Sequence, residues 1–258
     1  ASAGFLNAIK GLTDPQKKRM AVGEHFITVR NEVVAKQHLD ESRWMLAQGT
    51  LYPDIIESGG TKNSHTIKTH HNRVAGIQAL IEKGLIIEPL KDLYKDEVRS
   101  IGKKIGLEDE LVMRHPFPGP GLSINVLCTD GKAGAHDAEE MQKAQSELDA
   151  VQFTQFCRFP AVLTFRAEEN GFYHLPKKWE KLEAASSAVT NSAQYINRCI
   201  IKLWQTPRVT DEDLRLQEGY CDKRRLDQTR DADDIVLTAL HKNGWYNKIF
   251  QHLTINLP

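Results

Sequence analysis

The segment that most constrains the fold is Arg114–Leu122, RHPFPGPGL. Its stretch HPFPGPG holds three prolines and two glycines in seven residues. Proline lacks a backbone N–H and clashes with a preceding helical turn, and glycine weakens a strand interior, so this stretch can be neither a helix nor a central strand. It must be a rigid, shaped loop. Composition alone leaves two interpretations open: a stiff connector between domains, or a wall of a base-binding pocket built from a histidine and an aromatic ring.

Two helices are expected before this loop. Apolar residues at spacings of mostly three and four predict an amphipathic helix over 16–37. Asp14 and Pro15 are a suitable start for it, because a polar cap residue followed by proline in the first turn favours helix initiation. A second helix is predicted over 95–107, with Gly106 near its end.

Two short apolar runs between these helices predict buried strands. One run lies at 45–52 and the other at Leu85–Ile87, where Pro89 stops it. Helix, strand, loop, strand and helix in this order indicate an α/β domain with parallel strands. Ligands of such sheets lie at loops beyond the carboxyl ends of the strands. The stretch Leu51–Asn72 follows the first strand, so its position alone favours a functional site.

Composition excludes several classes of protein. The chain has 258 residues, of which 40% are hydrophobic and 26% charged, and its formal net charge is zero. This charge gives no general argument for nucleic acid or an anionic membrane as partner. No run approaches the roughly 18 apolar residues of a membrane span, and the start of the chain lacks a signal-peptide core. Four scattered cysteines without a CxxC pair suggest a reducing compartment, so we expect a cytoplasmic protein.

Two carboxylates follow the first predicted strand. Asp54 and Glu57 are three residues apart, so one helical turn would place both on one face. Paired hard oxygens near a phosphate are ligands that Mg²⁺ uses, but a solvated helix start is the commoner meaning of this spacing. The glycine-containing segment 58–64 lacks the spacing of a phosphate-binding loop and indicates a hinge or lid.

The sequence IKTHHN is richer in reactive side chains. In an extended chain, Lys68, His70 and Asn72 share one face and His71 points away. Lysine can stabilise a phosphate or a developing oxyanion, and histidine can transfer protons near neutral pH. A zinc site would need a third ligand at suitable spacing. A polar surface loop is the remaining alternative.

The second half of the chain changes character. Residues 129–228 are charged and helix-prone, which indicates solvated helices of an inserted subdomain. Mixed basic and aromatic residues there are also found in single-strand nucleic-acid binders, but nearby acids weaken that interpretation. A helical period resumes at 230–250, and the final residues HLTINLP predict the start of a strand.

Five ordered blocks of residues 5–127 resemble the ATP-pyrophosphatase domain of the GMP synthetase (glutamine-hydrolysing) family. The stretch from Arg230 to Pro258 resembles the opening of the same family's C-terminal dimerisation domain. The blocks are FLNAIKGLTDPQKKRMAVGEHF, LAQGTLYPDIIES, IKTHHN, IEPLKDLYKDEVRSIG and LVMRHPFPGPGLSINVL.

This resemblance implies an α/β fold of the adenine-nucleotide alpha-hydrolase type. Residues 1–122 would form the C-terminal portion of the ATP-pyrophosphatase domain, with a lid at 52–76. Residues 123–228 would be a linker and a largely helical insertion, and 229–258 the start of an α+β dimerisation domain. The short bacterial form of the family has no counterpart of this insertion, while longer eukaryotic members carry insertions there.

The resemblance also implies a reaction. ATP would adenylate the C2 oxygen of XMP and release pyrophosphate, and ammonia from a glutaminase domain would displace AMP to give GMP. Mg²⁺ is the implied cofactor, and a homodimer the implied assembly. Adenylation moves charge onto phosphate oxygens, which calls for cations, and the adenylated intermediate needs a lid that excludes water.

Site residues follow from the matched motifs only. Asp54 and Glu57 match the acidic pair of the lid, with Asp54 a candidate Mg²⁺ ligand. The basic cluster would do the chemistry, with lysine stabilising charge and one histidine transferring protons. The full set comprises Lys68, His70, His71, Asp54 and Glu57 as catalytic residues, Arg19 and Asn72 as XMP contacts, and Arg114, His115 and Phe117 as walls of the nucleotide pocket.

Some family segments have no match in this sequence. SGGTKNS, at 58–64, is not the family's pyrophosphate loop SGGxDS, and neither a glutaminase domain nor the family's closing segment KPPATIEWE is found. We therefore expect this chain to be the middle portion of a longer enzyme. The alternative is a non-catalytic nucleotide-binding or assembly fragment.

Overall fold

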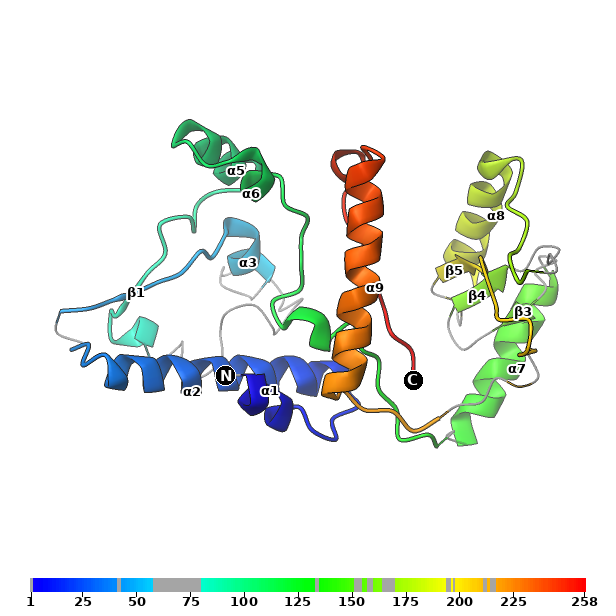
Figure 1. The fold of residues 1–258 in the computed structure, drawn as a ribbon, viewed down its shortest axis with the longest axis horizontal. Helices are drawn as coiled ribbons and strands as arrows, with labels where there is room; N and C mark the ends of the chain where they lie inside the picture. Colours follow the sequence, from blue (N-terminus) through cyan, green and yellow to red (C-terminus); the bar gives the residue numbers. More distant parts are fainter. Residues whose placement is uncertain are drawn as a thin grey trace. The chain divides into compact units, whose positions relative to one another are not determined.

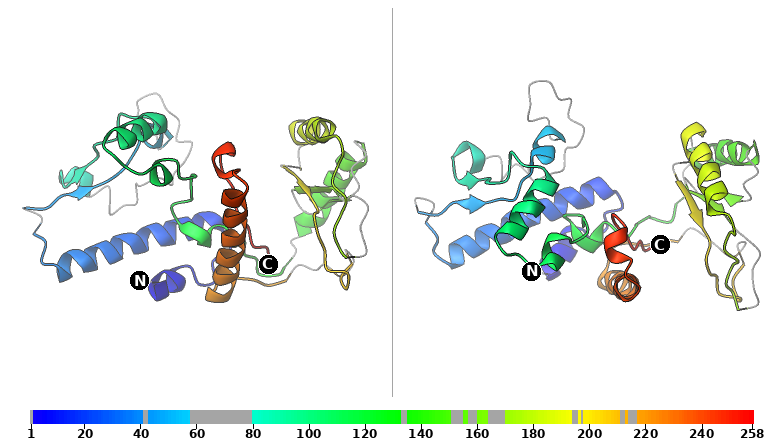
Figure 2. Two further views of the ribbon diagram at one scale, coloured as in Figure 1. Left: turned by 45° about the horizontal axis from the view of Figure 1, so that its top comes forward. Right: turned by 90° about the horizontal axis from the view of Figure 1, so that it is seen from above.

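The computed structural model contains two compact units. Unit 1 comprises Ala1–Asp130 and Glu218–Pro258, and unit 2 comprises Gly131–Gln217. Figures 1 and 2 show the chain from three directions. The structure describes residues 2–40, 43–57, 80–132, 135–150, 155–156, 160–163, 170–193, 196, 198–210, 213 and 217–258.

Unit 1 combines helices with a small parallel sheet, which agrees with the predicted α/β class. Its elements are α1 (Ser2–Ala8), α2 (Pro15–Lys36), β1 (Leu46–Ala47), α3 (Tyr52–Glu57), β2 (Ile86–Ile87), α5 (Lys95–Lys104), α6 (Asp109–Val112), η1 (Gly121–Ser123), α9 (Lys223–Lys242) and η3 (Tyr246–Lys248).

Helix α2 begins where the sequence predicts it. The side chain of Asp14 accepts a hydrogen bond from the backbone N–H of Lys17 at 2.8 Å, and Pro15 opens the first turn. These interactions satisfy one N-terminal donor and preset the backbone of the first turn. The apolar side of the helix is only partly covered, since Val22 is 5% exposed while Phe26 is 53% exposed.

The predicted strands pair in parallel, but they are not buried. Leu46 lies opposite Ile86 and Ala47 opposite Ile87 in β1 and β2. Both strands alternate between half-buried and exposed positions, and Ile87 is 47% exposed. The prediction of buried strands is therefore wrong, because in the described residues neither face of this two-stranded pair is closed by a second layer.

Helix α5 stops three residues before the predicted end. Gly106 adopts φ +87°, a left-handed conformation that L side chains rarely adopt, and Leu107 N–H bonds back to the Gly102 carbonyl at 3.0 Å. This pattern terminates helices because it satisfies carbonyls that the next turn would have bonded.

The core of unit 1 brings residues near the start of the chain into contact with residues near its end. Val126 pairs in parallel with Asn256, and Thr129 pairs in antiparallel fashion with Gly219. Val126 is fully buried together with Ile9 and packs with the apolar side chains of α1 and α2. The buried cluster contains Ile9, Val22, Val126 and Cys221, with Phe5, Ala21, Cys128 and Leu226 packed against it.

Helix α9 is shifted toward the N-terminus relative to the predicted 230–250. It begins after Asp222, whose side chain accepts from the backbone N–H of Arg225 at 2.7 Å. It ends at Lys242, before Gly244 at φ +65°. The strand predicted for the final residues amounts to the single bridge at Asn256.

Unit 2 contains helices, as predicted, and also a sheet, which the sequence analysis did not predict. Strand β4 pairs with β3 in antiparallel and with β5 in parallel fashion. Helix α7 contacts β3, and α8 contacts β5 (Figure 2). The elements are α7 (Ala135–Ala150), β3 (Gln155–Phe156), β4 (Pro160–Leu163), α8 (Trp179–Ser192) and β5 (Arg198–Ile201).

Candidate active site

The acidic pair lies on the short helix α3, directly after the loop that follows β1. Asp54 and Glu57 are both helical, as their spacing predicts. Asp54 Oδ2 accepts a hydrogen bond from the backbone N–H of Leu51 at 2.9 Å. This carboxylate therefore caps the start of its own helix, which is the structural role that acidic residues favour there.

The predicted catalytic cluster belongs to a part of the chain that the structure does not describe. Lys68, His70, His71 and Asn72 all lie outside the described residues. Their roles therefore stay predictions from the sequence, as does the lid at 52–76 beyond its first helix.

The predicted XMP contact Arg19 lies on α2. Its Nη1 donates to Gln16 Oε1 at 3.4 Å, one turn earlier on the same helix. Since the contact is long, it leaves the guanidinium only weakly positioned.

The proline-rich segment is a non-helical loop from Arg114 to Pro120, followed by η1. The carbonyl of Arg114 accepts a hydrogen bond from Arg99 Nη2 of α5 at 3.1 Å. Phe117 is 47% exposed, as a side chain that could stack on a base would be. The prediction that this segment is neither helix nor strand is confirmed from Arg114 to Pro120, and its rigidity and its use as a pocket wall stay predictions.

His115 is the predicted site residue with the richest set of contacts. Its ring stacks on Tyr246, with centroids 3.9 Å apart and an interplanar angle of 4°. Its Nε2 lies 2.7 Å from the Tyr246 carbonyl oxygen, and its Nδ1 lies 3.3 Å from Nδ1 of His252. Its backbone N–H donates to the Tyr246 hydroxyl at 3.1 Å. The loop is thus fastened to the C-terminal segment.

A second set of bonds extends this junction to α9. His252 Nε2 lies 3.3 Å from Asp233 Oδ1, and the Thr254 hydroxyl donates to the same oxygen at 2.8 Å. Gln251 Nε2 donates to the Pro116 carbonyl at 2.8 Å. Side chains from α9, from η3 and from the residues that follow η3 therefore fix the orientation of the proline-rich loop.

Lys18 binds the backbone that follows the proline-rich loop. It is 1% exposed, and its ammonium group donates to the carbonyls of Ser123 at 3.0 Å and Val126 at 2.7 Å. It also lies 3.4 Å from Cys128 Sγ. Three acceptors match the three donors of an ammonium group, so the buried charge is compensated by hydrogen bonds.

The thiol of Cys221 lies in the same buried cluster. Burial raises the pKa of Cys221 to about 11, while the nearby charge of Lys18 opposes the rise. This cysteine is therefore a packed, protonated thiol rather than a nucleophile near neutral pH.

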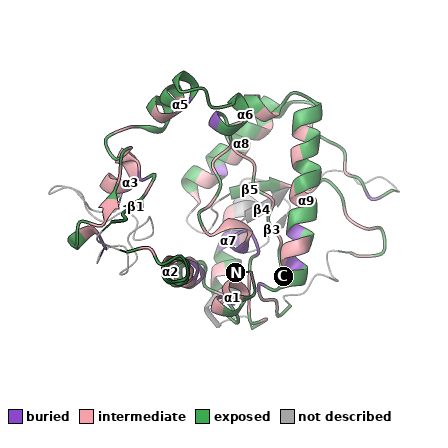
Figure 3. Cartoon of the chain, turned by 60° about the vertical axis from the view of Figure 1, so that its left-hand side comes forward, coloured by how far each residue is buried: buried purple, intermediate pink, exposed green. Residues whose placement is uncertain are grey.

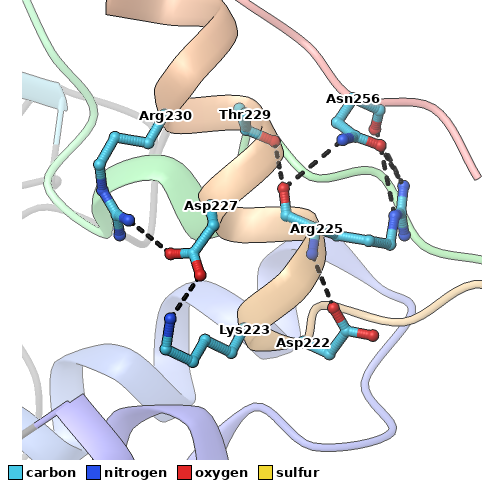
Figure 4. A network of polar contacts seen from close by, with 7 residues as sticks. All are labelled: Asp222, Lys223, Arg225, Asp227, Thr229, Arg230 and Asn256. Carbon is cyan, nitrogen blue, oxygen red and sulfur yellow. Dashed lines mark hydrogen bonds and ion pairs between the residues drawn. The ribbon is translucent and has the colours of Figure 1, made fainter.

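Arg225 anchors the first turns of α9, where the buried residues of that helix lie (Figure 3). Its guanidinium donates from Nη2 to both Asn256 oxygens, at 3.0 Å and 3.2 Å, and from Nη1 to the Tyr220 carbonyl at 3.1 Å. The Thr229 hydroxyl donates to the Arg225 carbonyl at 2.7 Å. Figure 4 shows the bonds of Arg225 with Asn256 and Thr229, and Asn256 also forms the isolated bridge with Val126.

A groove of about 760 Å³ lies between α1, α2, the end of the proline-rich segment and α9. Its walls combine apolar rings such as Phe5 and Phe26 with the charged Lys223, Asp227 and Arg230. Asp227 bonds both Lys223 and Arg230, and these bonds, that from Lys223 first, lower the pKa of its carboxyl. None of the predicted site residues that the structure describes is among the residues lining this groove.

The described residues do not form a metal site. They contain no group of three or more histidine, cysteine, aspartate or glutamate side chains placed to hold an ion. Asp54 is already engaged as a helix cap. Because Mg²⁺ often takes only one or two protein carboxylates beside phosphate and water, Asp54 as its ligand stays a prediction.

Several residues of the junction were not found from the sequence. Lys18 lies four residues before Val22, on the same face of the predicted helix, and this placement was a signal that it could be buried. Asp233, Tyr246 and His252 carried no such local signal, because their partner His115 is distant in the sequence.

Fold and site together describe an α/β domain in which a proline-rich loop and a short acidic helix follow the parallel strands. In α/β domains, loops at the strand ends commonly carry the ligand site, and α3 occupies such a place after β1. Among the described residues, no helix combines the length and the apolar character needed to cross a membrane.

Comparison with known proteins identifies the family. The chain is 38% identical to a probable glutamine-hydrolyzing GMP synthase of Leptospira interrogans over 268 residues, which covers 100% of this chain and 43% of the relative. It is 50% identical to the GMP synthase of Alteromonas mediterranea over 82% of this chain and 45% of the relative. The Aspergillus fumigatus GMP synthase is 52% identical over 49% of this chain. No protein-family model matches the chain.

The chain is therefore a homologue of proteins named as glutamine-hydrolysing GMP synthases, and one such match covers its whole length. It spans less than half the length of the curated relatives named above. The Leptospira match runs the full length of the chain, so a bacterial relative also carries a counterpart of unit 2.

Proposed function

We propose that the protein containing this chain is a GMP synthase, a ligase that forms a C–N bond. It would use ATP to adenylate XMP, and ammonia derived from glutamine would then displace AMP to give GMP and pyrophosphate. The observation that carries this proposal is the match along the whole chain to a relative named as a GMP synthase. We further propose that it acts in the cytoplasm as a homodimer of the pyrophosphatase fold, with no nucleic acid or membrane as partner.

The residues divide the work by their chemistry. Lys68 would neutralise charge that develops on the phosphate oxygens, and His70 or His71 would transfer a proton. Arg19 and Asn72 would bind XMP, and Arg114, His115 and Phe117 would form one wall of the nucleotide pocket. The support for that wall is the junction that holds His115, together with the exposure of Phe117.

Asp54 and Glu57 would stand at the base of the lid. Mg²⁺ is proposed as the companion of ATP, since phosphate oxygens and water supply most of its ligands in such sites.

The decisive experiment measures pyrophosphate release by the whole protein with ATP plus XMP, ATP plus IMP, and ATP alone. Release that depends on XMP is expected, and release with none of the three mixtures would favour the non-catalytic alternative. Lys68→Leu should reduce XMP-dependent release by orders of magnitude. Near-normal release by that variant would remove Lys68 from the mechanism.

A further inference from the structure

The contact between His115 and His252 brings two Nδ1 atoms together, and one of them must carry a proton for a hydrogen bond to form. His115 Nε2 lies 2.7 Å from the carbonyl oxygen of Tyr246. A carbonyl only accepts hydrogen bonds, so this nitrogen carries a proton and donates. A neutral imidazole has a single N–H, which leaves His115 Nδ1 as an acceptor.

The other ring is constrained in the same way. His252 Nε2 lies 3.3 Å from Asp233 Oδ1, and that oxygen accepts a bond from the Thr254 hydroxyl at 2.8 Å. A carboxylate this close favours an N–H at His252 Nε2. If His252 were neutral with its proton at Nε2, its Nδ1 would carry a lone pair and would face the lone pair of His115 Nδ1 at 3.3 Å.

We propose that the two rings share one additional proton between their Nδ1 atoms. His252 is then an imidazolium that connects the carboxylate of Asp233 to His115, and it is a positioning residue for the proline-rich loop. The chain of polar contacts runs from Asp233 through His252 and His115 to the carbonyl of Tyr246. The number of protons on the two rings (the proton count) is inferred from geometry alone. Only the consequence for nucleotide binding rests on the proposed function.

The surroundings favour a single positive charge. The side chains of His252 and Asp233 are 14% and 13% exposed, so the cation has its counter-charge within the same partly buried site. The ring centroids of His115 and His252 are 5.5 Å apart, and the facing nitrogens lie between them. Tyr246 stacks on His115, and His241 stacks on the same tyrosine with centroids 4.1 Å apart.

A transition metal is the competing cation. Histidine ligands usually donate their outer N–H to a carboxylate or a carbonyl, as both rings do here. However, two nitrogens make an incomplete site, and the described part of the chain supplies no group of three such ligands. A proton needs only the two nitrogens that are present.

The shared proton makes the loop sensitive to protonation in both directions. Loss of the proton leaves two facing lone pairs, and a further proton places two N–H groups against each other. In either case the bond between His252 and His115 breaks, while the bond from Gln251 to the Pro116 carbonyl remains. The loop is therefore best ordered while a single proton lies between the two rings, which face Asp233 and, across Tyr246, His241.

The test uses the whole protein with ¹⁵N-labelled histidines, whose ring nitrogens report protonation by NMR. The expected spectrum has His252 protonated at both nitrogens and His115 protonated at Nε2 only. In His252→Phe the Nδ1 signal of His115 should shift, because it loses its donor. His241→Phe is the matched control, since it keeps an aromatic ring against Tyr246 and should leave both signals in place. A singly protonated His252, or an unshifted His115 in His252→Phe, would overturn the proposal.

Two further measurements separate the alternatives. Zn²⁺ added to the whole protein should give no stoichiometric binding that depends on these rings. Zn²⁺ binding that is lost in both His115→Phe and His252→Phe would identify the cation as a metal and would contradict the shared proton. In the assay with ATP and XMP, His252→Phe should raise the nucleotide KM about tenfold, as expected for loss of a charge-assisted bond, with a much smaller change in kcat.

The outcomes of the two assays are distinguishable. An unchanged KM together with the expected NMR spectrum would refute the positioning role and leave the proton count intact. A wild-type protein without XMP-dependent activity would refute the proposed function, and the NMR result would still decide the shared proton.

Discussion

The two units of the chain close their interiors in different ways. In unit 1, Lys18 and Arg225 are buried and donate to backbone carbonyls distant in the sequence, those of Ser123 and Asn256. In the described part of unit 2, the buried side chains are those of Ala144, Val189 and Ile196, which are all apolar. Hydrogen bonds are directional and costly to leave unmade, whereas apolar burial scales with area. Unit 1 should therefore be the more sensitive to single substitutions that keep size.

The largest effect is expected for Lys18→Met. The substitution keeps the apolar stem but leaves the carbonyls of Ser123 and Val126 without their donor. We expect a loss of about 3 kcal/mol in the unfolding free energy of unit 1, in the range given by buried unsatisfied groups. Chemical denaturation measures this loss. Lys17→Met, at an exposed neighbouring position, is the control, and equal midpoints for the two variants would contradict the importance of the buried ammonium.

The next largest effect is expected for Arg225→Lys. A lysine keeps the charge but cannot reproduce the paired bonds to Asn256 and the bond to Tyr220. The expected cost is about 2 kcal/mol, with faster hydrogen exchange at the Val126–Asn256 bridge. Arg224→Lys changes an exposed arginine on the same helix and should cost far less; a similar cost would show that the guanidinium network is not special.

A smaller effect is expected for Ile196→Val in unit 2. Ile196 is 2% exposed, and removal of one methyl group there should cost about 1 kcal/mol. Ile200→Val, at a residue that is 41% exposed, should cost less. Hydrogen exchange resolved by unit should report the change in unit 2 only. A matching loss of protection in unit 1 would mean that the two units unfold as one.

The smallest effect is expected for exposed ion pairs, which occur in both units. The bonds from Lys223 and Arg230 lower the pKa of Asp227, and the bond from Lys143 lowers that of Glu139. A lowered carboxyl pKa contributes stability above the unfolded pKa, and this contribution is lost as pH falls through the folded value. Asp227→Asn and Glu139→Gln should therefore reduce stability slightly at neutral pH and not at all in strong acid.

The comparison of these two acidic variants sharpens the contrast between the units. Added salt should diminish both effects, because both pairs are exposed. A clearly larger effect in unit 1 would indicate that its surface, as well as its interior, depends on charge.

Local sequence was enough to predict much of the backbone. The start of α2 followed from Asp14 and Pro15, and the end of α5 near Gly106 followed from glycine chemistry. Parallel pairing of β1 and β2 followed from the order of elements. These features depend on neighbouring residues, so the information lies within a few positions of the chain.

Burial and the polar junction could not be predicted in the same way. The acceptors of Lys18 lie 105 and 108 residues away, and His252 lies 137 residues from His115. Whether Ile87 is covered depends on a second layer of structure rather than on its own strand. The catalytic assignment of Lys68 came from a motif alone and stays a prediction.

The pairing of Thr129 with Gly219 has a consequence for how the family varies. Each residue donates its N–H to the other's carbonyl at 2.9 Å, and the whole of 131–217 lies between them in the sequence. The host domain therefore brings the two ends together with its own backbone, independently of what connects them. Because closing a longer connection costs only about 0.6 kcal/mol per doubling of length, this point can accept a module of almost any size. It is a permissive insertion point, at which a domain could be gained, lost or exchanged without changes to the core residues around Val126.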